Sequence, residues 1–482
     1  MLSSRLAVCT AGTAFTAPLL CFISVTLRQI ARILTAGLLG IVACGGDSES
    51  GRLPDAPRSH TAASVLRLPR DKGAARLYRV PALEPSAWKQ TDKLPALATV
   101  VGADIEQRLV YAVDDKQNLV GLDLESRRVR PFLPRVRHAA VGPDGALYAV
   151  DSASAVTQFV RRAPVKFRPR LAGAPGDLFG TQQGGLVVLP EGGRGEAVLL
   201  SPDQARAAAH LPVGRAAATY LGDLIAVAAD TAVVLYEPQA QTPVRSLEVP
   251  GGVRAVTFSP SGHRLYVARQ SGDIRVLDRL SGETLETIEL PGAARELRMH
   301  FYGHWLLARP ERGDSVWVVD LSTDRLAGTV PARWSDDLPV VAGERTLLVR
   351  ASGDVRALDL AAEGFPVTGE VDGGADDAWL PLAWLPAGEQ REDLAADSAA
   401  ADSAAAGATV YLQVSSSRNP EWAQELTAKL KSAGLPASVL APKRGEDVYR
   451  VVIGPYATRE QAEATGRTLG MPSFVISTEE QQ

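Results

Sequence analysis

Candidate catalytic side chains are few in this sequence of 482 residues. The segment HFYGH places His300 and His304 four residues apart, on one face if they share a strand, where two imidazoles could bind a metal ion. The alternative, which we favour, is a turn with two partly buried histidines. The segment is not a zinc-binding HExxH helix, because Phe301 stands in place of the glutamate and Gly303 interrupts the helix.

Motifs for nucleophilic catalysis and for cofactor binding are also missing from the sequence. The serines in DSAS, from Asp151, and in SPSGH, from Ser259, belong to turn sequences, and there is no G-x-S-x-G elbow. The three cysteines are Cys9, Cys21 and Cys44, so the rest of the chain has neither a thiolate nucleophile nor a cysteine metal site. We predict a protein that is not an enzyme, with no catalytic residues, no metal site and no cofactor.

Polar side chains suited to ligand binding occur near the C-terminus. Alternation predicts strands in TVYLQVSS, PASVLAP, DVYRVVIGPY and PSFVIS. NPEWAQELTAKLKS and ATREQAEATGRTL have the caps and apolar spacing of helices. The order β-α-β-β-α-β is a split βαβ sandwich, an α+β fold in which both helices cover one face of the sheet. The other face is predicted to be open and to display Gln413, Ser415 or Ser416, and Arg450.

The ends of the two helices are marked by residue type. Asn419 is placed to cap the first helix, Pro420 to occupy its first turn, and Gly434 to end it. Thr458 and Gln461 have the spacing of a capping box at the start of the second helix. Both helices are therefore predicted with defined boundaries.

Two stretches, YLQVSSSRNPEWAQELTAKLKSAGLP and YRVVIGPYATREQAEA, resemble the SPOR domain of bacterial envelope proteins. The resemblance covers residues 409–478 and implies binding to peptidoglycan, with a preference for glycan strands stripped of stem peptides. It also implies that Gln413, Ser416 and Arg450 face the glycan, while Tyr456 supports the fold. Val448 stands where several septum-targeted members carry tryptophan, and SSS at 415–417 replaces Gly-Ser-Phe. Loss of an aromatic face predicts weaker sugar binding.

A pattern of strand, polar turn and strand recurs seven times at offsets of 37 to 41 residues, which indicates an internal repeat. The fullest unit, residues 251–290, has four apolar runs separated by SPSGH, RQSGD and RLSGE, and four strands per unit describe one blade of a β-propeller. The units resemble WD40-type and YVTN-type blades. We predict a mainly β fold with seven blades in residues 94–387. The copies begin at Val110, Leu147, Leu186, Leu224, Leu265, Trp305 and Thr346.

An eighth blade is the alternative. AWLPLAWLPAG, from Ala378, matches the first strand of a further blade, and ARLYRV, from Ala75, is a candidate partner strand from the other end of the domain. Such a pairing would close the ring, and ring closure protects strand edges. Residues 44–93 and 388–408 have little periodicity and are typical of a tether and a low-complexity linker.

Residues 1–43 are predicted to be a signal peptide of the lipoprotein type. Two arginines precede a short apolar run, and IVAC at residues 41–44 resembles a bacterial lipobox. The resemblance implies lipidation of Cys44 and, because Gly45 follows, favours the outer membrane. The alternative is an uncleaved or ordinarily cleaved signal in which Cys44 has no role. Residues 6–27 are also apolar, and they are either a transmembrane helix or, as we favour, the result of a start codon placed too far upstream.

The net charge of −4 gives no reason to expect nucleic acid as a partner. We predict a periplasmic lipoprotein, anchored to a membrane through Cys44, that binds peptidoglycan glycan strands through its SPOR domain. The propeller would recruit an envelope protein, in cell division or wall remodelling. Two alternatives stay open. The propeller is a hydrolase- or lyase-type enzyme, with a metal or a quinone-type cofactor, or it is a scaffold in outer-membrane protein assembly.

Overall fold

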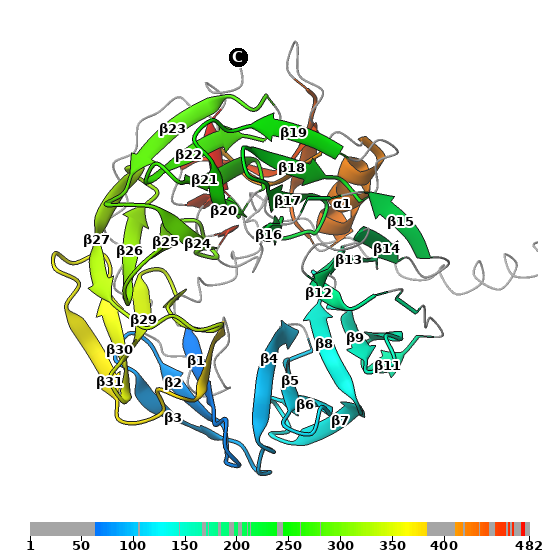
Figure 1. Ribbon diagram of the computed structural model, residues 1–482, viewed down its shortest axis with the longest axis vertical. Coiled ribbons are helices and arrows are strands. Elements are labelled where there is room, and N and C mark those ends of the chain that lie inside the picture. Colours follow the sequence, from blue (N-terminus) through cyan, green and yellow to red (C-terminus); the bar gives the residue numbers. More distant parts are fainter. Residues whose placement is uncertain are drawn as a thin grey trace, which may run out of the picture. The chain divides into compact units, whose positions relative to one another are not determined.

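The computed structural model (Figure 1) describes most of residues 63–382 and parts of residues 410–477. The predicted signal peptide with Cys44, the linker 388–408 and Val448 lie outside the described residues. The described ranges are 63–104, 107–143, 145–165, 170–171, 173–181, 185–191, 197–200, 205–209, 211–212, 214–238, 244–260, 262–279, 281–382, 410–417, 420–432, 434–442, 449–458, 461–462, 465–466 and 474–477.

The described residues form nine four-stranded sheets, of which eight lie within residues 64–382. Seven of these eight are antiparallel meanders in chain order. They are β4 (Leu97–Asp104), β5 (Leu109–Asp114), β6 (Leu119–Asp123) and β7 (Val129–Leu133); β8 (Val136–Val141), β9 (Leu147–Asp151), β10 (Val156–Val160) and β11 (Ala163–Pro164); β12 (Pro175–Gly180), β13 (Leu186–Pro190), β14 (Ala197–Leu200) and β15 (Ala205–Ala209); β16 (Ala216–Ala218), β17 (Ile225–Ala228), β18 (Ala232–Tyr236) and β19 (Val244–Glu248); β20 (Val253–Phe258), β21 (Arg264–Arg269), β22 (Asp273–Asp278) and β23 (Thr284–Glu289); β24 (Ala294–Met299), β25 (Trp305–Pro310), β26 (Ser315–Asp320) and β27 (Arg325–Pro331); β28 (Val340–Ala342), β29 (Thr346–Ala351), β30 (Asp354–Asp359) and β31 (Val367–Val371).

The β20–β23 sheet shows why these segments form strands. Its central strands β21 and β22 are covered on both faces and therefore contain apolar runs such as LYVA, with Leu265 and Val267 fully buried. The outer strand β23 buries Ile288 and is otherwise exposed. Gly272 and Gly282 turn the chain with φ of 95° and 77°, a conformation that residues with a Cβ rarely adopt.

The eighth sheet joins the two ends of the propeller. β32 (Ala378–Leu382) pairs with β1 (Ser64–Leu68), and β2 (Arg76–Arg79) and β3 (Glu84–Lys89) follow. β1 and β32 are antiparallel, with Ser64 opposite Leu382 and Leu68 opposite Ala378. The eight-bladed alternative is therefore confirmed, and seven blades is too few.

The sequence prediction of a tether over residues 44–93 is wrong for residues 64–89, which form the strands β1, β2 and β3. These strands have no repeat partner nearby in the sequence, because the strand that completes their sheet lies at the other end of the domain. The direct partner of β32 is SVLRL, at Ser64–Leu68, while ARLYRV supplies the next strand outward.

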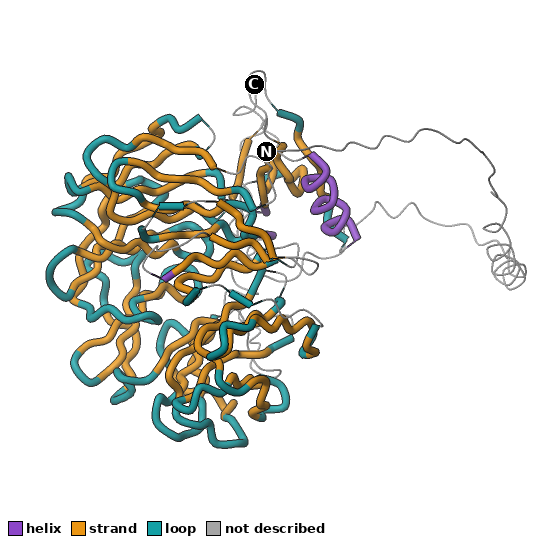
Figure 2. The backbone as a smooth tube through the Cα atoms, turned by 45° about the vertical axis from the view of Figure 1, so that its right-hand side comes forward, coloured by secondary structure: helices purple, strands orange, loops and turns teal. Residues whose placement is uncertain are grey.

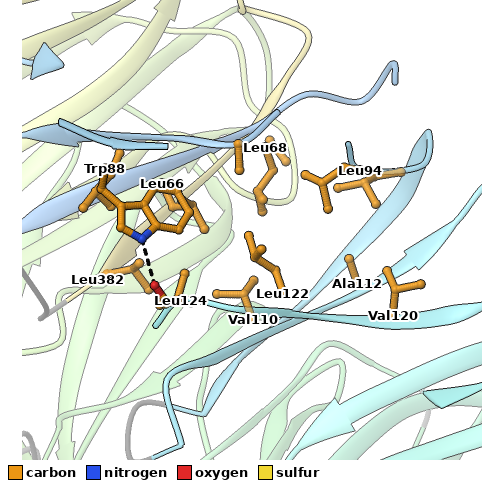
Figure 3. Close-up of a cluster of buried hydrophobic side chains, with 14 residues drawn as sticks. Leu66, Leu68, Trp88, Leu94, Val110, Ala112, Val120, Leu122, Leu124 and Leu382 are labelled. Carbon is orange, nitrogen blue, oxygen red and sulfur yellow. Dashed lines mark hydrogen bonds between the residues drawn. The ribbon is translucent and has the colours of Figure 1, made fainter. Parts of the chain in front are cut away.

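Each of the eight sheets packs its apolar side chains on the next, which closes a ring (Figure 1). The eighth sheet packs on the β4–β7 sheet around Trp88, whose Nε1 donates a hydrogen bond of 2.8 Å to the carbonyl oxygen of Leu124 (Figure 3). On its other face, Val65 and Trp379 pack against Leu348 of β29. Strand faces are thereby covered all round the ring, as propeller blades require.

A buried charged network joins the eighth sheet to the β28–β31 sheet. Arg350, whose side chain is 3 % exposed, holds Asp337 at 2.8 Å and donates a hydrogen bond of 2.7 Å to the carbonyl oxygen of Asp377. Asp337 also accepts a hydrogen bond of 2.7 Å from the backbone N–H of Trp379. Burial alone would raise the pKa of Asp337, but the hydrogen bonds and charge of Arg350 outweigh it, so the pKa lies below its usual value.

The C-terminal domain contains β33 (Val410–Ser417), α1 (Pro420–Ser432), β34 (Ala437–Leu440), β35 (Tyr449–Tyr456), helical residues at 461–462 and 465–466, and β36 (Phe474–Ser477). The strand order is β34-β35-β33-β36, with every neighbouring pair antiparallel. This arrangement confirms the predicted split βαβ sandwich. Figure 2 draws α1 as the long purple segment among strands.

The predicted helix ends are confirmed where the structure describes them. Gly434 has φ of 82°, and the N–H of Leu435 donates to the carbonyl oxygen of Leu430, the pattern of a Schellman cap. The Gln461 N–H donates to Thr458 Oγ1 at 3.2 Å, while Gln461 Oε1 accepts from the N–H of Ala457 at 3.3 Å. Within the described ranges, no helix has both the length and the apolarity to cross a membrane.

Candidate functional site

The pairing of β33 with β35 brings the predicted site residues together. Ser416 lies opposite Arg450, and Gln413 lies opposite Val452, on adjacent central strands. The register shifts between Gln413 and Ser415, so one extra residue is accommodated on β33. Two of the predicted residues are therefore direct cross-strand partners, and the third is near them on the same strand.

The opposite face of the sheet is the hydrophobic core of the domain. Leu412 and Val414 of β33 and Val451 and Ile453 of β35 pack in one cluster with side chains of α1, including Leu426. Because side chains alternate along a strand, Gln413, Arg450 and Val452 point to the face away from α1. The sequence prediction that helix and polar residues occupy different faces is confirmed for these positions.

The polar face is more enclosed than predicted. Gln413 is 2 % exposed, while Arg450 is half-buried. Ser415, which is 3 % exposed, lies opposite Val451 of the core, so the register shift removes it from the face of Gln413 on which alternation places it. The expectation that Gln413 is displayed on an open face is wrong in this respect. Gln413 lies on the central strand β33, between β35 and β36, with the fully buried Val452 opposite it, and sequence alternation does not show how closely a side chain is enclosed.

The amide of Gln413 has unused hydrogen-bonding capacity. Its Nε2 has no hydrogen-bond partner among the described residues, although the side chain is buried. Buried polar atoms are nearly always hydrogen-bonded, and an unpaired donor costs about 1–3 kcal/mol. A ligand with a carbonyl or hydroxyl oxygen at this position would satisfy the donor. The glycan contacts assigned to Gln413, Ser416 and Arg450 remain predictions, and Val448 lies outside the described residues.

Tyr456 supports the fold, as predicted. Its ring packs against the core of the domain, and its hydroxyl is hydrogen-bonded to Thr465 in the second helical segment. Burial raises the pKa of Tyr456 above its usual value, against the lowering effect of that hydrogen bond. Tyr456 therefore links the end of β35 to the helical side of the domain.

Val452 is the residue of this face whose role the sequence analysis missed. It is fully buried and lies directly opposite Gln413. Its alternation with Arg450 along β35 is the sequence signal that places it on the same face. Its apolar side chain lies beside Gln413 and helps to enclose it.

The histidine pair lies in the turn between β24 and β25. His300 is buried, and its Nε2 is hydrogen-bonded to the carbonyl oxygen of Gly343 at 2.8 Å. Burial lowers its pKa to about 3. His304 is exposed, with its ring centroid 5.6 Å from that of His300. The favoured interpretation of a turn is correct, but one of the two histidines is buried and the other is not.

Among the described residues, no cluster of three or more His, Cys, Asp or Glu side chains has an arrangement suited to a metal ion.

Comparison with known proteins supports the C-terminal assignment. Residues 406–476 match the SPOR domain family. No curated protein matches the chain. AztD from Citrobacter koseri superposes with a TM-score of 0.49 at 11 % identity, covering 67 % of this chain and 98 % of AztD. Dihydro-heme d1 dehydrogenase NirN, solved in complex with DHE, superposes with a TM-score of 0.49 at 16 % identity, covering 69 % of this chain and 78 % of NirN. These two likenesses are too distant to bear on function.

Proposed function

We propose that the protein binds the glycan strands of peptidoglycan through its SPOR domain. The observation that carries this proposal is the match of residues 406–476 to that family, whose members bind peptidoglycan. The register that sets Ser416 opposite Arg450 gives the proposal its site. The preference for strands stripped of stem peptides follows from the same resemblance.

The side chains of this face suit the groups that a glycan strand presents. Arg450 matches a carboxylate, which a sugar carries where its stem peptide has been removed. The unpaired amide donor of Gln413 matches the carbonyl oxygen of an acetamido group. Because Gln413 is enclosed and Arg450 is partly exposed, we expect Arg450 to make the first contact.

Retention of the full chain on amidase-treated sacculi tests the proposal. Charge-assisted hydrogen bonds contribute about 1.5–3 kcal/mol, so Arg450→Ala is expected to weaken retention by about tenfold or more. Lys431→Ala, which removes an exposed cation from α1, is the matched control and is expected to bind as the unaltered chain does. A chain that is not retained, or two variants that bind equally, would defeat the proposal.

The location of the protein is a second part of the proposal. Lipidation of Cys44 would anchor the chain in the envelope, with the outer membrane favoured, and the propeller would recruit an envelope protein in division or wall remodelling. The SPOR match supports an envelope location. A fluorescent fusion imaged in dividing cells, with and without residues 409–482, checks the septal role. Cys44→Ser is expected to release the protein from the membrane fraction.

The propeller is proposed to act by binding and not by catalysis. The histidine most suggestive of chemistry, His300, is buried and hydrogen-bonded to the backbone of Gly343, which supports a structural role. Elemental and cofactor analysis of the purified chain provides the check. A stoichiometric metal or quinone would favour the enzymatic alternative.

A further inference from the structure

Arginines occupy turns of the first two blades where other residue types are usual. Non-glycine residues with positive φ are uncommon, and Asn, Asp and His are the types most often found there. Such backbone strain persists where the surrounding structure holds it, and it is a reason to ask what the side chain does. Four of these arginines lie in or beside hairpin turns within a blade, namely Arg108, Arg127, Arg161 and Arg162, with φ of 51°, 60°, 47° and 70°. A fifth, Arg135, with φ of 59°, lies in the connection between β7 and β8 at the other end of the sheets and is not part of this group.

Hairpin geometry puts these turns on one rim of the propeller. In a four-stranded meander the first and third turns lie at the same end of the sheet. In the β4–β7 sheet these are the turn between β4 and β5 and the turn between β6 and β7. The turn after β10 belongs to the next blade and contacts both of them. Arg162 Nη1 is 3.2 Å from Asp123 Oδ2, and Arg162 Nη2 donates a hydrogen bond of 3.0 Å to the carbonyl oxygen of Gln107. Figure 1 shows the two blades side by side.

We call this surface the arginine rim. It consists of the exposed or half-exposed arginines at these turns and at the adjacent start of β7, which are Arg108, Arg127, Arg128, Arg130, Arg161 and Arg162.

Carboxylates neutralise only part of the arginine rim. Asp123 lies 3.2 Å from Arg162 and 3.5 Å from Arg130, and Glu125 lies 3.1 Å from Arg108. Burial alone would raise the pKa of Asp123, but backbone and side-chain hydrogen bonds from Ser126 and the charge of Arg162 hold it below its usual value. Asp123 is therefore ionised at neutral pH and already committed to its two arginines.

The other three arginines are available to a partner. Arg127, Arg128 and Arg161 are exposed, and none has an ion-pair partner among the described residues. The surrounding sequence is basic as well. Residues 97–171 contain 12 Lys and Arg and 8 Asp and Glu, a net charge of 12 − 8 = +4, in a chain whose 51 basic and 55 acidic residues give −4. The two blades thus stand out as a cationic sector of an acidic protein.

We infer that the arginine rim is a second glycan-binding surface, which binds the carboxylates of peptide-free glycan strands. The inference rests on the proposed function of the SPOR domain. Hydrolysis of the amide that joins a stem peptide to its sugar leaves a carboxylate at each such sugar, so a stripped strand is a regular polyanion. Guanidinium groups match carboxylates with two parallel hydrogen bonds.

The two binding surfaces are joined in a way that favours one shared strand. The 27 residues 383–409 connect the propeller to the SPOR domain, and a chain of that length reaches at most about 90 Å. Once the SPOR domain holds a strand, the arginine rim meets the same strand at the high effective concentration that a linker imposes. Weak contacts at the rim then raise the overall affinity.

The experiment compares full-length variants on amidase-treated sacculi. The rim variant carries Arg127→Gln, Arg128→Gln and Arg161→Gln, which remove the three charges. At the two positions with positive φ, 127 and 161, glutamine keeps an unbranched side chain and so changes the backbone strain little. The control carries Arg295→Gln, Arg312→Gln and Arg325→Gln, three exposed arginines in the blade of β24–β27. An exposed ion pair is typically worth about a factor of two in affinity, so we expect about tenfold weaker retention for the rim variant and an unchanged control.

Two further measurements identify the ligand group. The difference between rim variant and control is expected to shrink at high salt, because exposed charges are screened. It is also expected to vanish on sacculi whose carboxylates have been converted to amides. Equal retention of rim variant and control, or a rim effect that persists without carboxylates, would overturn the inference. If the rim variant bound vesicles of anionic lipid more weakly than the control did, but the two bound sacculi equally, the inference would be overturned in favour of a membrane surface.

The outcomes keep this inference separate from the proposed function. If the unaltered chain and Arg450→Ala bind alike, the SPOR site fails whatever the rim does. If Arg450→Ala weakens retention and the rim variant does not, the proposed function stands and the arginine rim fails. Matching thermal unfolding of the rim variant and the unaltered chain shows that a loss of retention is not a loss of fold.

Discussion

Replacing Arg350 by alanine is expected to destabilise the propeller at the point where its ring closes. Arg350 is nearly completely buried and binds Asp337 at 2.8 Å, while its other donors reach the carbonyl oxygens of Ala375 and Asp377 and the hydroxyl of Ser335. These contacts join the β28–β31 sheet to the segment that leads into β32.

The size of the effect follows from what the substitution leaves behind. Asp337 is 12 % exposed and would keep its charge without its cationic partner. Removing one member of a buried ion pair typically costs about 3–5 kcal/mol. We therefore expect Arg350→Ala to lower the free energy of unfolding by about that amount, measured by denaturant titration of tryptophan fluorescence. Exposed Arg356→Ala, which breaks a pair with Glu370, is the control and is expected to cost about 0–1 kcal/mol.

The pH dependence provides a second, independent readout. In the unaltered protein the pKa of Asp337 lies below its usual value, so its contribution is present at neutral pH and is lost as pH falls through the folded-state pKa. Without Arg350, burial becomes the dominant influence and raises the pKa of Asp337 above its usual value. Protonation of Asp337 on acidification then removes the uncompensated charge from the variant. The difference in the free energy of unfolding between the two proteins is therefore expected to narrow from pH 7 towards pH 4.

A double-variant cycle decides whether the reasoning is right. If the cost comes from an uncompensated carboxylate, Arg350→Ala combined with Asp337→Ala should recover a substantial part of the lost stability. A cost for Arg350→Ala within about 1 kcal/mol of the unaltered protein would refute the argument. So would a double variant with no recovery and a stability gap that is constant with pH.

Three further outcomes can be checked. Deleting residues 64–68 removes the strand that pairs with β32. We therefore expect the buried Trp379 to become exposed, with a shift of its fluorescence to the red, and limited proteolysis to cut near residues 378–382. An unchanged digestion pattern would contradict ring closure by β1. Gly434→Ala adds a Cβ at φ of 82°, where no other atom lies within 4 Å, so the expected cost is backbone strain alone, about 1 kcal/mol. This cost should lower the melting temperature of the SPOR domain. An unchanged melting temperature would count against the role of Gly434 as the helix cap. Burial lowers the pKa of His300 to about 3, so below pH 6.5 the unfolded chain binds one more proton than the folded chain, and the free energy of unfolding should fall by up to about 1.4 kcal/mol per pH unit on acidification. His300→Asn should make this pH dependence less steep in urea titrations. An equal pH dependence in the two proteins would refute the assignment.

Much of the fold could be predicted because its information is local and repeated. The apolar runs of β21 and β22, with glycine turns between them, recur in blade after blade, so the repeat reports the sheet directly. The SPOR domain was predictable for a related reason, since Gly434 and the Thr458–Gln461 pair mark helix ends by their residue types.

What could not be predicted depends on partners that are remote in the sequence. ARLYRV, which contains β2, was a candidate strand, but β1 and β3 were not predicted, because their sheet is completed by β32 from the far end of the domain and no local period marks them. The enclosure of Gln413 depends on packing around its strand, which alternation cannot show. The arginine rim was also hidden, because the sequence shows Arg127 and Arg161 but neither their positive φ nor the contact between the blades that carry them.

The pairing of Ser64 with Leu382 also has a mechanical consequence. The chain enters and leaves the ring at neighbouring positions on one end of a single strand pair. If the chain is anchored at Cys44 and bound to the wall through its SPOR domain, as proposed, tension between the two would load that strand pair first and separate β1 from β32 one hydrogen bond at a time from Ser64 towards Leu68. The other seven sheets would lie outside the path of the force, so the rest of the propeller would bear no load until β1 and β32 had separated.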